Sequence, residues 1–574
     1  MLRFAALALG LSTVWLHAQT VCGPTPAYSI CDITFDLPGG IPPATELNAE
    51  FRGPSQRTFL LRAFPRGAHQ LVVRFSPFEA GAWTVRLSST LAQFHDKELQ
   101  FTATPSASNG WIIPANVHHF RYTGGAPTAN MTPAHLWVGD TLPETISPAE
   151  LDSWIDARAR AGVTHVRLQA PNTIDEAAFD ALDARLDALA RKGLIADLVL
   201  TPPPALQRED RQKFFEYLIA RCSARNLTWV MLPQFESVPH AHELLREIAG
   251  YLNEDPFHHP RSVGAAVTSA PFADEKWMDV RSYGSPDWVV SAVEQQVYAK
   301  PAVALVQASS PEDFRHQLWN TTMSGAYPEA VATTPETLRY LSIWQKLFAD
   351  ARHWDMEPYF DVDGARGMAL PDTEYVLYVE HPRAITVNFD RKHKWNVAWI
   401  NPISGEWLPE KNIKQEMYAG PPPDSSHDWI LYVYREGHKE SLKSYRFESR
   451  PILEQEVEAD PAKVTFELVT PANIPAADPS EPSTPPMFTA KDNIPYSAKL
   501  KKETRASKQM IYEWTGEVTA DDEGYRVLGT GASGTFQLPP NMAYRFPATL
   551  HIRLYGVNGL GKLYSLDQNV GITK

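Results

Sequence analysis

Asn226-Leu-Thr-Trp-Val-Met-Leu-Pro-Gln-Phe-Glu-Ser237 is the stretch of sequence that decides the fold. A mostly apolar run follows Asn226 and is broken at Pro233. Such a run is typical of a buried parallel strand, because helices cover both faces of the sheet. In a (β/α)₈ barrel the functional side chains follow the C-terminal ends of the strands. Gln234 and Glu236, which follow this strand, are therefore the first candidate site residues.

The surrounding segment, residues 111–360, alternates strand-like apolar runs with helix-like runs. Eight strands are predicted, at 134–138, 164–168, 195–200, 227–232, 262–267, 280–283, 302–306 and 326–331. Ser147-Pro-Ala-Glu150 opens one of the helices with a capping box and places Pro at its first position. Eight such units in about 250 residues predict a TIM barrel. No glycine-rich dinucleotide fingerprint follows the first strand, which argues against a doubly wound open sheet.

Both sides of this segment consist of short alternating runs broken by Gly and Pro, a pattern that predicts β-sandwiches. A length of 574 residues also suits several domains better than one. We expect an N-terminal β-sandwich, a central (β/α)₈ TIM barrel and C-terminal β-sandwich domains. The expected boundaries are a signal peptide at 1–19, an Ig-like sandwich at 22–106, the barrel at 111–360, a β-sandwich at 361–450, and a β-rich domain at 451–574 with a Pro-rich linker at 476–486.

Composition and the N-terminus bear on location and partners. The formal net charge of −14 disfavours nucleic acid and anionic membrane surfaces as partners. Arg3, an apolar run and Ala18 resemble a secretory signal, and no later apolar run approaches the ~20 residues of a membrane span. We expect a secreted or periplasmic protein without membrane insertion, and the oligomeric state stays open. Cys22 and Cys31 are close enough in sequence for a small disulfide loop in an oxidising compartment.

Several strings resemble a family of secreted bacterial glycosidase-like proteins. Phe51-Arg-Gly-Pro-Ser, followed by Arg74-Phe-Ser-Pro-Phe-Glu-Ala-Gly-Ala-Trp-Thr-Val, resembles the immunoglobulin-like module that precedes the barrel in that family. Leu136-Trp-Val-Gly-Asp-Thr141 resembles the family's first barrel strand, and a later string resembles its last helix and the loop after it: Arg315, Trp319, Ser324-Gly325 and Tyr327. These barrels are related to apiosidase-type glycoside hydrolases. The string that begins at Trp395 resembles the β-sandwich after such barrels, which is named for collagen binding.

The resemblance implies a carbohydrate-active protein whose partner is a polysaccharide or oligosaccharide, and it also indicates where catalytic acids belong. Retaining glycosidases use two carboxyl groups about 5 Å apart. Matching Asn226 and Trp229 to the family pattern puts Gln234 at the position of the acid on strand four. On strand seven, Val306 or Gln307 stands at the position of the second carboxylate. An amide cannot donate a proton to a leaving group or act as the nucleophile, but it can hydrogen-bond to sugar hydroxyls. The resemblance therefore favours glycan binding with hydrolysis weakened or lost.

Two alternatives remain open. In the first, Glu236 is the acid of an active hydrolase of plant or bacterial polysaccharide, because a two-residue slip keeps the same strand face. Asp140 or Glu294 would then be the second acid. In the second alternative, the chain is a surface scaffold or adhesion protein, which a barrel mouth filled by the loop at 272–278 would favour.

The remaining candidate residues concern ligand contact and metal. Arg167 and Asp140 end or follow strands and could contact hydroxyls, while Tyr283 and Trp277 could stack on sugar rings. The pairs His118-His119 and His258-His259 have no Asp or Glu at metal-ligand spacing, so neither a metal nor a cofactor is expected.

Overall fold

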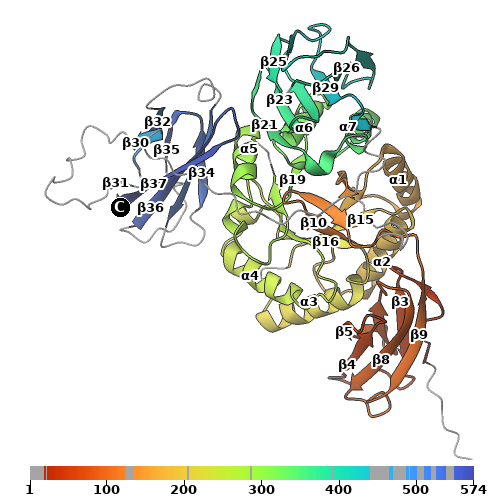
Figure 1. Cartoon of the computed structure of the whole chain (residues 1–574). Coiled ribbons are helices and arrows are strands. Elements are labelled where there is room, and N and C mark those ends of the chain that lie inside the picture. Colours follow the sequence, from red (N-terminus) through yellow and green to blue (C-terminus); the bar gives the residue numbers. More distant parts are fainter. Residues whose placement is uncertain are drawn as a thin grey trace, which may run out of the picture.

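The computed structural model describes residues 19–20, 22–124, 134–202, 206–284, 287–389, 392–439, 464–468, 487–489, 491–500, 510–518, 525–537 and 548–573. Within them, one parallel barrel with helices around it is flanked by several further β-sheets (Figure 1). The predicted signal peptide, apart from Gln19, and the predicted linker at 476–486 lie outside the described residues. No helix in the described part of the chain is long and apolar enough to cross a membrane.

The barrel is an eight-stranded sheet in the order β17-β16-β15-β14-β13-β20-β19-β18. Because β13 pairs in parallel with both β14 and β20, the first and last strands meet and the sheet is nearly closed, which confirms the predicted barrel. Its strands are β13 (Gly139–Thr141), β14 (His165–Gln169), β15 (Ile195–Leu200), β16 (Leu227–Met231), β17 (Arg261–Val263), β18 (Arg281–Tyr283), β19 (Ala302–Val306) and β20 (Tyr327–Ala330).

Seven α-helices among the described residues accompany the barrel strands. They are α1 (Pro148–Ala161), α2 (Glu176–Arg191), α3 (Arg208–Cys222), α4 (Ala241–Leu252), α5 (Trp288–Val297), α6 (Pro311–Met323) and α7 (Pro335–Ala349). Their N-termini follow local sequence: Asp175, Ser310 and Thr334 each accept a hydrogen bond from a backbone N–H of the first helical turn. The apolar sides of these helices and the strands form the largest core.

The first barrel strand lies later in the chain than predicted. Residues Ala134–His135 form β12, which joins β10 (Ile112–Ala115) and β11 (His119–Tyr122) in a separate three-stranded sheet. The barrel strand itself begins at Gly139. A Cβ atom on Gly139 would lie 2.6 Å from the carboxyl group of Glu329, so the close approach of these two strands requires glycine here. An apolar run in the sequence does not by itself show at which residue a strand begins to pair with its neighbours in the barrel.

Two N-terminal sheets share a hydrophobic core that includes Phe51, Phe75 and Trp83. One has the order β1-β3-β7-β6 and the other β2-β9-β8-β4-β5. Their strands are β1 (Gln19–Thr20), β2 (Thr25–Pro26), β3 (Cys31–Asp36), β4 (Leu47–Arg52), β5 (Thr58–Arg62), β6 (Phe64–Arg66), β7 (Gln70–Phe75), β8 (Gly81–Ser89) and β9 (Glu98–Thr104).

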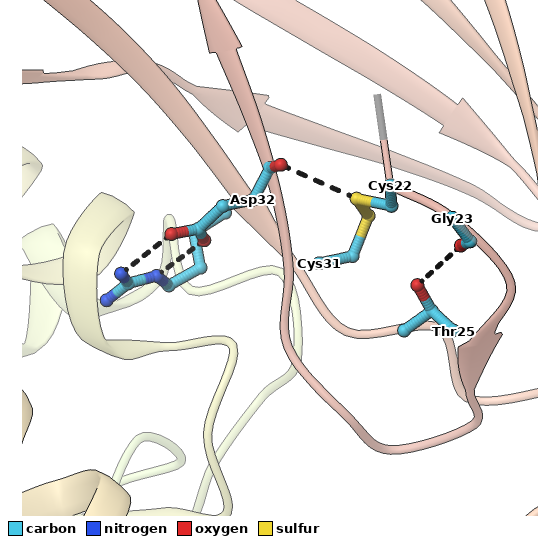
Figure 2. The surroundings of a disulfide bond; sticks show 6 residues. Cys22, Gly23, Thr25, Cys31 and Asp32 are labelled. Carbon is cyan, nitrogen blue, oxygen red and sulfur yellow. Dashed lines mark hydrogen bonds and ion pairs between the residues drawn. A yellow bond between two sulfur atoms is a disulfide. The ribbon is translucent and has the colours of Figure 1, made fainter. Parts of the chain in front are cut away.

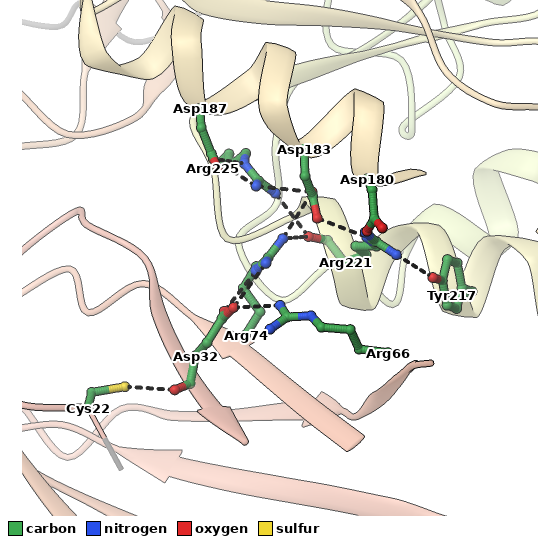
Figure 3. Close-up of polar contacts among 10 residues, drawn as sticks. All are labelled: Cys22, Asp32, Arg66, Arg74, Asp180, Asp183, Asp187, Tyr217, Arg221 and Arg225. Carbon is green, nitrogen blue, oxygen red and sulfur yellow. Dashed lines mark hydrogen bonds and ion pairs between the residues drawn. The ribbon is translucent and has the colours of Figure 1, made fainter. Parts of the chain in front are cut away.

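An ionic cluster joins these sheets to α2 and α3 (Figure 3). Arg74 of β7 donates to Asp32 at 2.8 Å and to Asp183 of α2 at 3.1 Å. Asp183 also accepts from Arg221 at 2.9 Å and lies 3.0 Å from Arg225. The three arginine side chains are nearly buried, so each carboxylate here is needed to compensate a desolvated charge. The cluster therefore orients the N-terminal sheets on the barrel.

A disulfide joins Cys22 and Cys31 beside this cluster (Figure 2). The closed loop is short, with a sequence separation of nine residues. We expect the double variant Cys22→Ser/Cys31→Ser to lose about 2–3 kcal/mol of unfolding free energy in the N-terminal sheets, because an open loop gives the unfolded chain more conformations. Urea unfolding measures this loss, and wild-type protein treated with a reductant is the matched control. An unchanged midpoint in both samples would contradict the prediction.

Within the described residues, four further sheets lie C-terminal to the barrel. The orders β21-β23-β24-β29-β26-β27 and β22-β25-β28 share one core, and β30-β32-β35 and β31-β37-β36-β33-β34 follow. Their strands are β21 (Glu357–Tyr359), β22 (Val362–Asp363), β23 (Arg366–Leu370), β24 (Glu374–Val379), β25 (Ile385–Asn388), β26 (Trp395–Ile400), β27 (Trp407–Pro409), β28 (Met417–Gly420), β29 (Trp429–Arg435), β30 (Val464–Leu468), β31 (Met487–Thr489), β32 (Ile494–Leu500), β33 (Ile511–Val518), β34 (Arg526–Thr530), β35 (Ser533–Phe536), β36 (Ala548–Val557) and β37 (Leu563–Thr573). The last sheet packs against α5 through a small apolar cluster (Figure 1).

Candidate functional site

A cavity of about 540 Å³ opens at the C-terminal ends of the barrel strands. Its polar and aromatic lining consists mainly of Trp137, Arg167, Gln234, Tyr283, Gln307 and Glu329. Strand side chains alternate between the inside and the outside of a barrel, so the register determines which of them reach the cavity. In the strand register, Arg167 lies opposite Asp197, and Glu329 lies opposite Leu305 and Gly139. Arg167, Leu305 and Glu329 all line the cavity, so these positions face the barrel interior.

Both amides that the sequence placed at the ends of strands four and seven line this cavity. Gln234 follows β16 in a left-handed conformation, with φ of 54°, and its side chain is exposed. Gln307 follows β19, and its backbone N–H donates to Gln317 at 3.2 Å. Arg167 and Tyr283 line the same cavity, so four of the predicted ligand-contact residues are brought together. Trp277 is not in the lining and packs against Phe272, with ring centroids 5.6 Å apart.

Glu329 is the cavity residue that sequence reasoning missed. It lies in the middle of β20 and is only 3% exposed. Burial raises the pKa of Glu329 well above its ordinary value, and the neighbouring Asp197 carboxylate raises it further, while Arg167 and the Trp137 indole oppose the change. Burial therefore favours the protonated form of Glu329. The available signal was a carboxyl group inside an otherwise buried strand, Tyr327-Pro-Glu-Ala330.

Asp197 of β15 is 1% exposed, and its carboxylate is the group that acts on the pKa of Glu329. Its Oδ1 atom accepts from His165 Nδ1 at 2.8 Å and from Thr228 Oγ1 at 2.6 Å. Its Oδ2 atom and Glu329 Oε1 face no donor within the described residues. Buried oxygens are rarely left without a donor, and the proton that burial favours on Glu329 can supply one.

Asp140, a predicted catalytic residue, points out of the barrel and does not line the cavity. Its carboxylate accepts from Arg158 of α1 at 2.9 Å and from the backbone N–H of Ala332 at 2.8 Å. The side chain is fully buried, and this burial raises its pKa to about 6 although Ala332 and Arg158 lower it. The ion-pair partner of Asp140 is thus Arg158 and not the cavity residue Arg167. Asp140 attaches the first barrel strand to its helix.

Glu236, the other predicted catalytic residue, lies in the short 3₁₀ helix η1 (Phe235–Ser237) and is also outside the cavity lining. Its carboxylate accepts from the backbone N–H groups of Ala266 and Val267, at 2.7 and 2.9 Å. These contacts stabilise the loop after β17. Glu294, considered as a second acid, is buried on α5 and accepts from Thr268.

Two further observations concern whether a loop fills the cavity and whether nearby side chains are arranged to hold a metal ion. Residues 272–278 do not line the cavity, so this loop does not fill the mouth. Within the described residues, no group of three His, Cys, Asp or Glu side chains is arranged to hold a metal ion.

The chain is similar in fold to two solved structures. A glycoside hydrolase candidate from Bacteroides vulgatus superposes with a TM-score of 0.63 at 16% identity, over 72% of this chain and 100% of that chain. A second structure, a glycoside hydrolase, superposes with a TM-score of 0.50 at 13% identity, over 57% and 98%. The fold is glycoside hydrolase-like. No protein-family model and no curated protein matches the sequence. The glycoside hydrolase-like fold places the cavity where such barrels have their active sites.

Proposed function

We propose that the mouth of the barrel binds a polysaccharide or oligosaccharide, and that hydrolysis by two carboxyl groups is weakened or lost. The observation that carries the proposal is that Gln234 and Gln307 line one cavity in a glycoside hydrolase-like fold. Their amides, together with the Arg167 guanidinium, offer donors and acceptors for sugar hydroxyls. Tyr283 reaches the lining at the end of β18, but its ring packs with Ala302 and Ala304 and its hydroxyl accepts from Arg281, so it offers no stacking face to a sugar.

The chemistry of the lining supports the loss of hydrolysis. An amide supplies neither the proton for a leaving oxygen nor a charged nucleophile. General acid or base help is worth roughly 10²–10⁴-fold each, so replacing both acids by amides removes most of the acceleration. We include in the proposal export through the signal peptide, an immunoglobulin-like N-terminal domain and β-sandwich domains after the barrel, at the boundaries expected from the sequence.

A second candidate is an active hydrolase, and Glu329 is its best acid. Among the described residues that line the cavity, Glu329 carries the one carboxyl group, and its raised pKa suits a proton donor. Glu236 is a weaker candidate because its carboxylate is already used by two backbone N–H groups. A scaffold role has less support, because the loop at 272–278 leaves the mouth open.

The deciding experiment is a glycan array combined with digestion of plant and bacterial polysaccharides by the purified protein. We expect binding without turnover. Gln307→Leu, which removes the amide but keeps a similar volume, should weaken binding roughly tenfold, since a lost hydrogen bond costs about 1.4 kcal/mol. The control Glu236→Gln should bind like the wild type. Turnover that disappears in Glu329→Gln would establish the hydrolase, and turnover that disappears in Glu236→Gln would restore Glu236 as the acid. Absence of any binding would refute the proposal.

A further inference from the structure

A file of hydrogen-bonded titratable side chains runs through the inside of the barrel. Tyr122 Oη lies 2.8 Å from His135 Nδ1, and His135 Nε2 lies 2.8 Å from His165 Nε2. His165 Nδ1 then lies 2.8 Å from Asp197 Oδ1, and Asp197 neighbours Glu329. His135, His165 and Asp197 are almost fully buried. Such a file is costly to bury unless every member has a partner, and each of these contacts supplies one.

The two ends of the file open into different cavities. Glu329 lines the cavity in the barrel mouth. Tyr122, which is half-buried, lines a second cavity of about 600 Å³. That cavity is also lined by Leu194 and Asn226, which immediately precede β15 and β16 and so mark the N-terminal end of the barrel. The file therefore connects the two opposite ends of the barrel.

With both imidazoles neutral and Asp197 as an acceptor, one arrangement of protons satisfies every contact in the file. Asp197 is an acceptor, so His165 carries its proton on Nδ1 and accepts at Nε2. His135 must then donate from Nε2 and accept at Nδ1, where the Tyr122 hydroxyl donates. In this arrangement each donor points toward Asp197. Burial, together with the neighbouring His165 and His353, lowers the pKa of His135 well below its ordinary value, which agrees with a neutral ring.

The rings are also held in place. Trp137 stacks on His165 with ring centroids 3.6 Å apart and an interplanar angle of 10°. Trp137 also lines the mouth cavity, so this indole contacts both the ligand site and the file. Thr228 fixes Asp197 from β16, and Arg167 is the cation that faces Glu329.

We infer that this file is a proton relay that resupplies Glu329, the proton-donating group of the mouth, from the opposite end of the barrel. The inference rests on the second candidate function, the active hydrolase, in which Glu329 protonates the leaving oxygen while the glycosidic bond breaks. When Glu329 gives its proton to the leaving oxygen as the glycosidic bond breaks, the proton on His165 Nδ1 passes to Asp197 and on to Glu329. His165 Nε2 takes the proton of His135 Nε2, and His135 Nδ1 takes that of Tyr122. Tyr122 regains a proton from solvent water in the second cavity. One proton enters and one leaves, and only the two imidazole tautomers are exchanged.

Nitrogen NMR of the full chain labelled with ¹⁵N-histidine tests the relay without any glycan. We expect neutral His165 with its proton on Nδ1 and neutral His135 with its proton on Nε2 near neutral pH. The signals are assigned by their loss in His165→Gln and His135→Gln. A doubly protonated ring at either position, or a proton on His165 Nε2, would overturn the relay. The wild-type spectrum alone decides this point, even if a variant fails to fold.

Two variants test whether the file connects to Glu329 at one end and to solvent through Tyr122 at the other. Glu329→Gln should shift the His165 Nδ1 resonance through Asp197, whereas Glu236→Gln, outside the cavity, should leave it unchanged. Tyr122→Phe should slow the exchange of the His135 Nε2 proton with solvent, because it removes the entry to the file. Unchanged exchange in Tyr122→Phe would refute the relay. Because these measurements need no ligand, a failed relay and a failed glycan proposal give different results.

Discussion

Gln234→Asp combined with Gln307→Glu is expected to turn the barrel into a measurable glycosidase. Both side chains line one cavity, so the variant returns two carboxyl groups to the ends of β16 and β19. Asp tolerates the left-handed backbone of Gln234 better than most residues, and Glu has nearly the shape of Gln at position 307. Each restored group should raise the rate roughly 10²–10⁴-fold, the usual contribution of a general acid or base.

The gain is measured as sugar released from the polysaccharide that the array identifies and as nitrophenol released from aryl glycosides. Gln307→Glu alone should act mainly on the aryl glycosides, because their leaving group needs little help from an acid. Gln234→Asn with Gln307→Glu is the matched control without the acid. If the double variant folds and binds glycan like the wild type but gains no turnover, the assignment of these two positions to the missing acids is wrong.

Asp428→Asn is expected to destabilise the contact between the barrel and the following sheets by about 3–5 kcal/mol, because it leaves the buried Arg315 without its counter-charge. Arg315 of α6 donates to Asp428 from both Nη2 and Nε, at 2.6 and 2.9 Å, and Tyr378 of β24 donates at 2.9 Å. Both charged side chains are nearly or fully buried. Urea unfolding followed by tryptophan fluorescence measures the loss, since Trp319 stacks against Tyr378 at this contact.

The effect of Asp428→Asn should also depend on pH. Burial alone raises the pKa of Asp428, but contacts from His316, Arg315 and Tyr378 lower it by more, to about 2. Because folding lowers this pKa, the carboxylate stabilises the fold above its unfolded pKa near 4, and that contribution is lost as the pH falls toward 2. The difference between variant and wild type should therefore shrink over this range.

An exposed ion pair provides the matched control for Asp428→Asn. Arg86 and Asp96 lie 3.0 Å apart with side chains 70% and 63% exposed. Asp96→Asn should lower the free energy of unfolding by less than about 1 kcal/mol, because exposed ion pairs usually contribute no more than that. Equal losses of unfolding free energy in Asp428→Asn and Asp96→Asn would show that burial does not determine how much the Arg315–Asp428 pair stabilises the protein.

The sequence by itself determined the order of elements in the barrel. The helices and seven of the eight strands lie close to their predicted positions, because each depends on local periodicity and on capping residues such as Asp175 and Ser310. Gln234 and Gln307 could be placed at the mouth for the same reason, since each directly follows a recognisable strand.

Only the tertiary structure decided which carboxyl groups face the cavity. Asp140 and Glu329 occupy neighbouring strands, yet one points at α1 and the other into the barrel. A shift of one residue in register exchanges the two faces of a strand, and register depends on pairing between segments far apart in sequence. The same holds for the contacts from Tyr122 to Asp197, since no local pattern shows that β11, β12, β14 and β15 bring these side chains into one line.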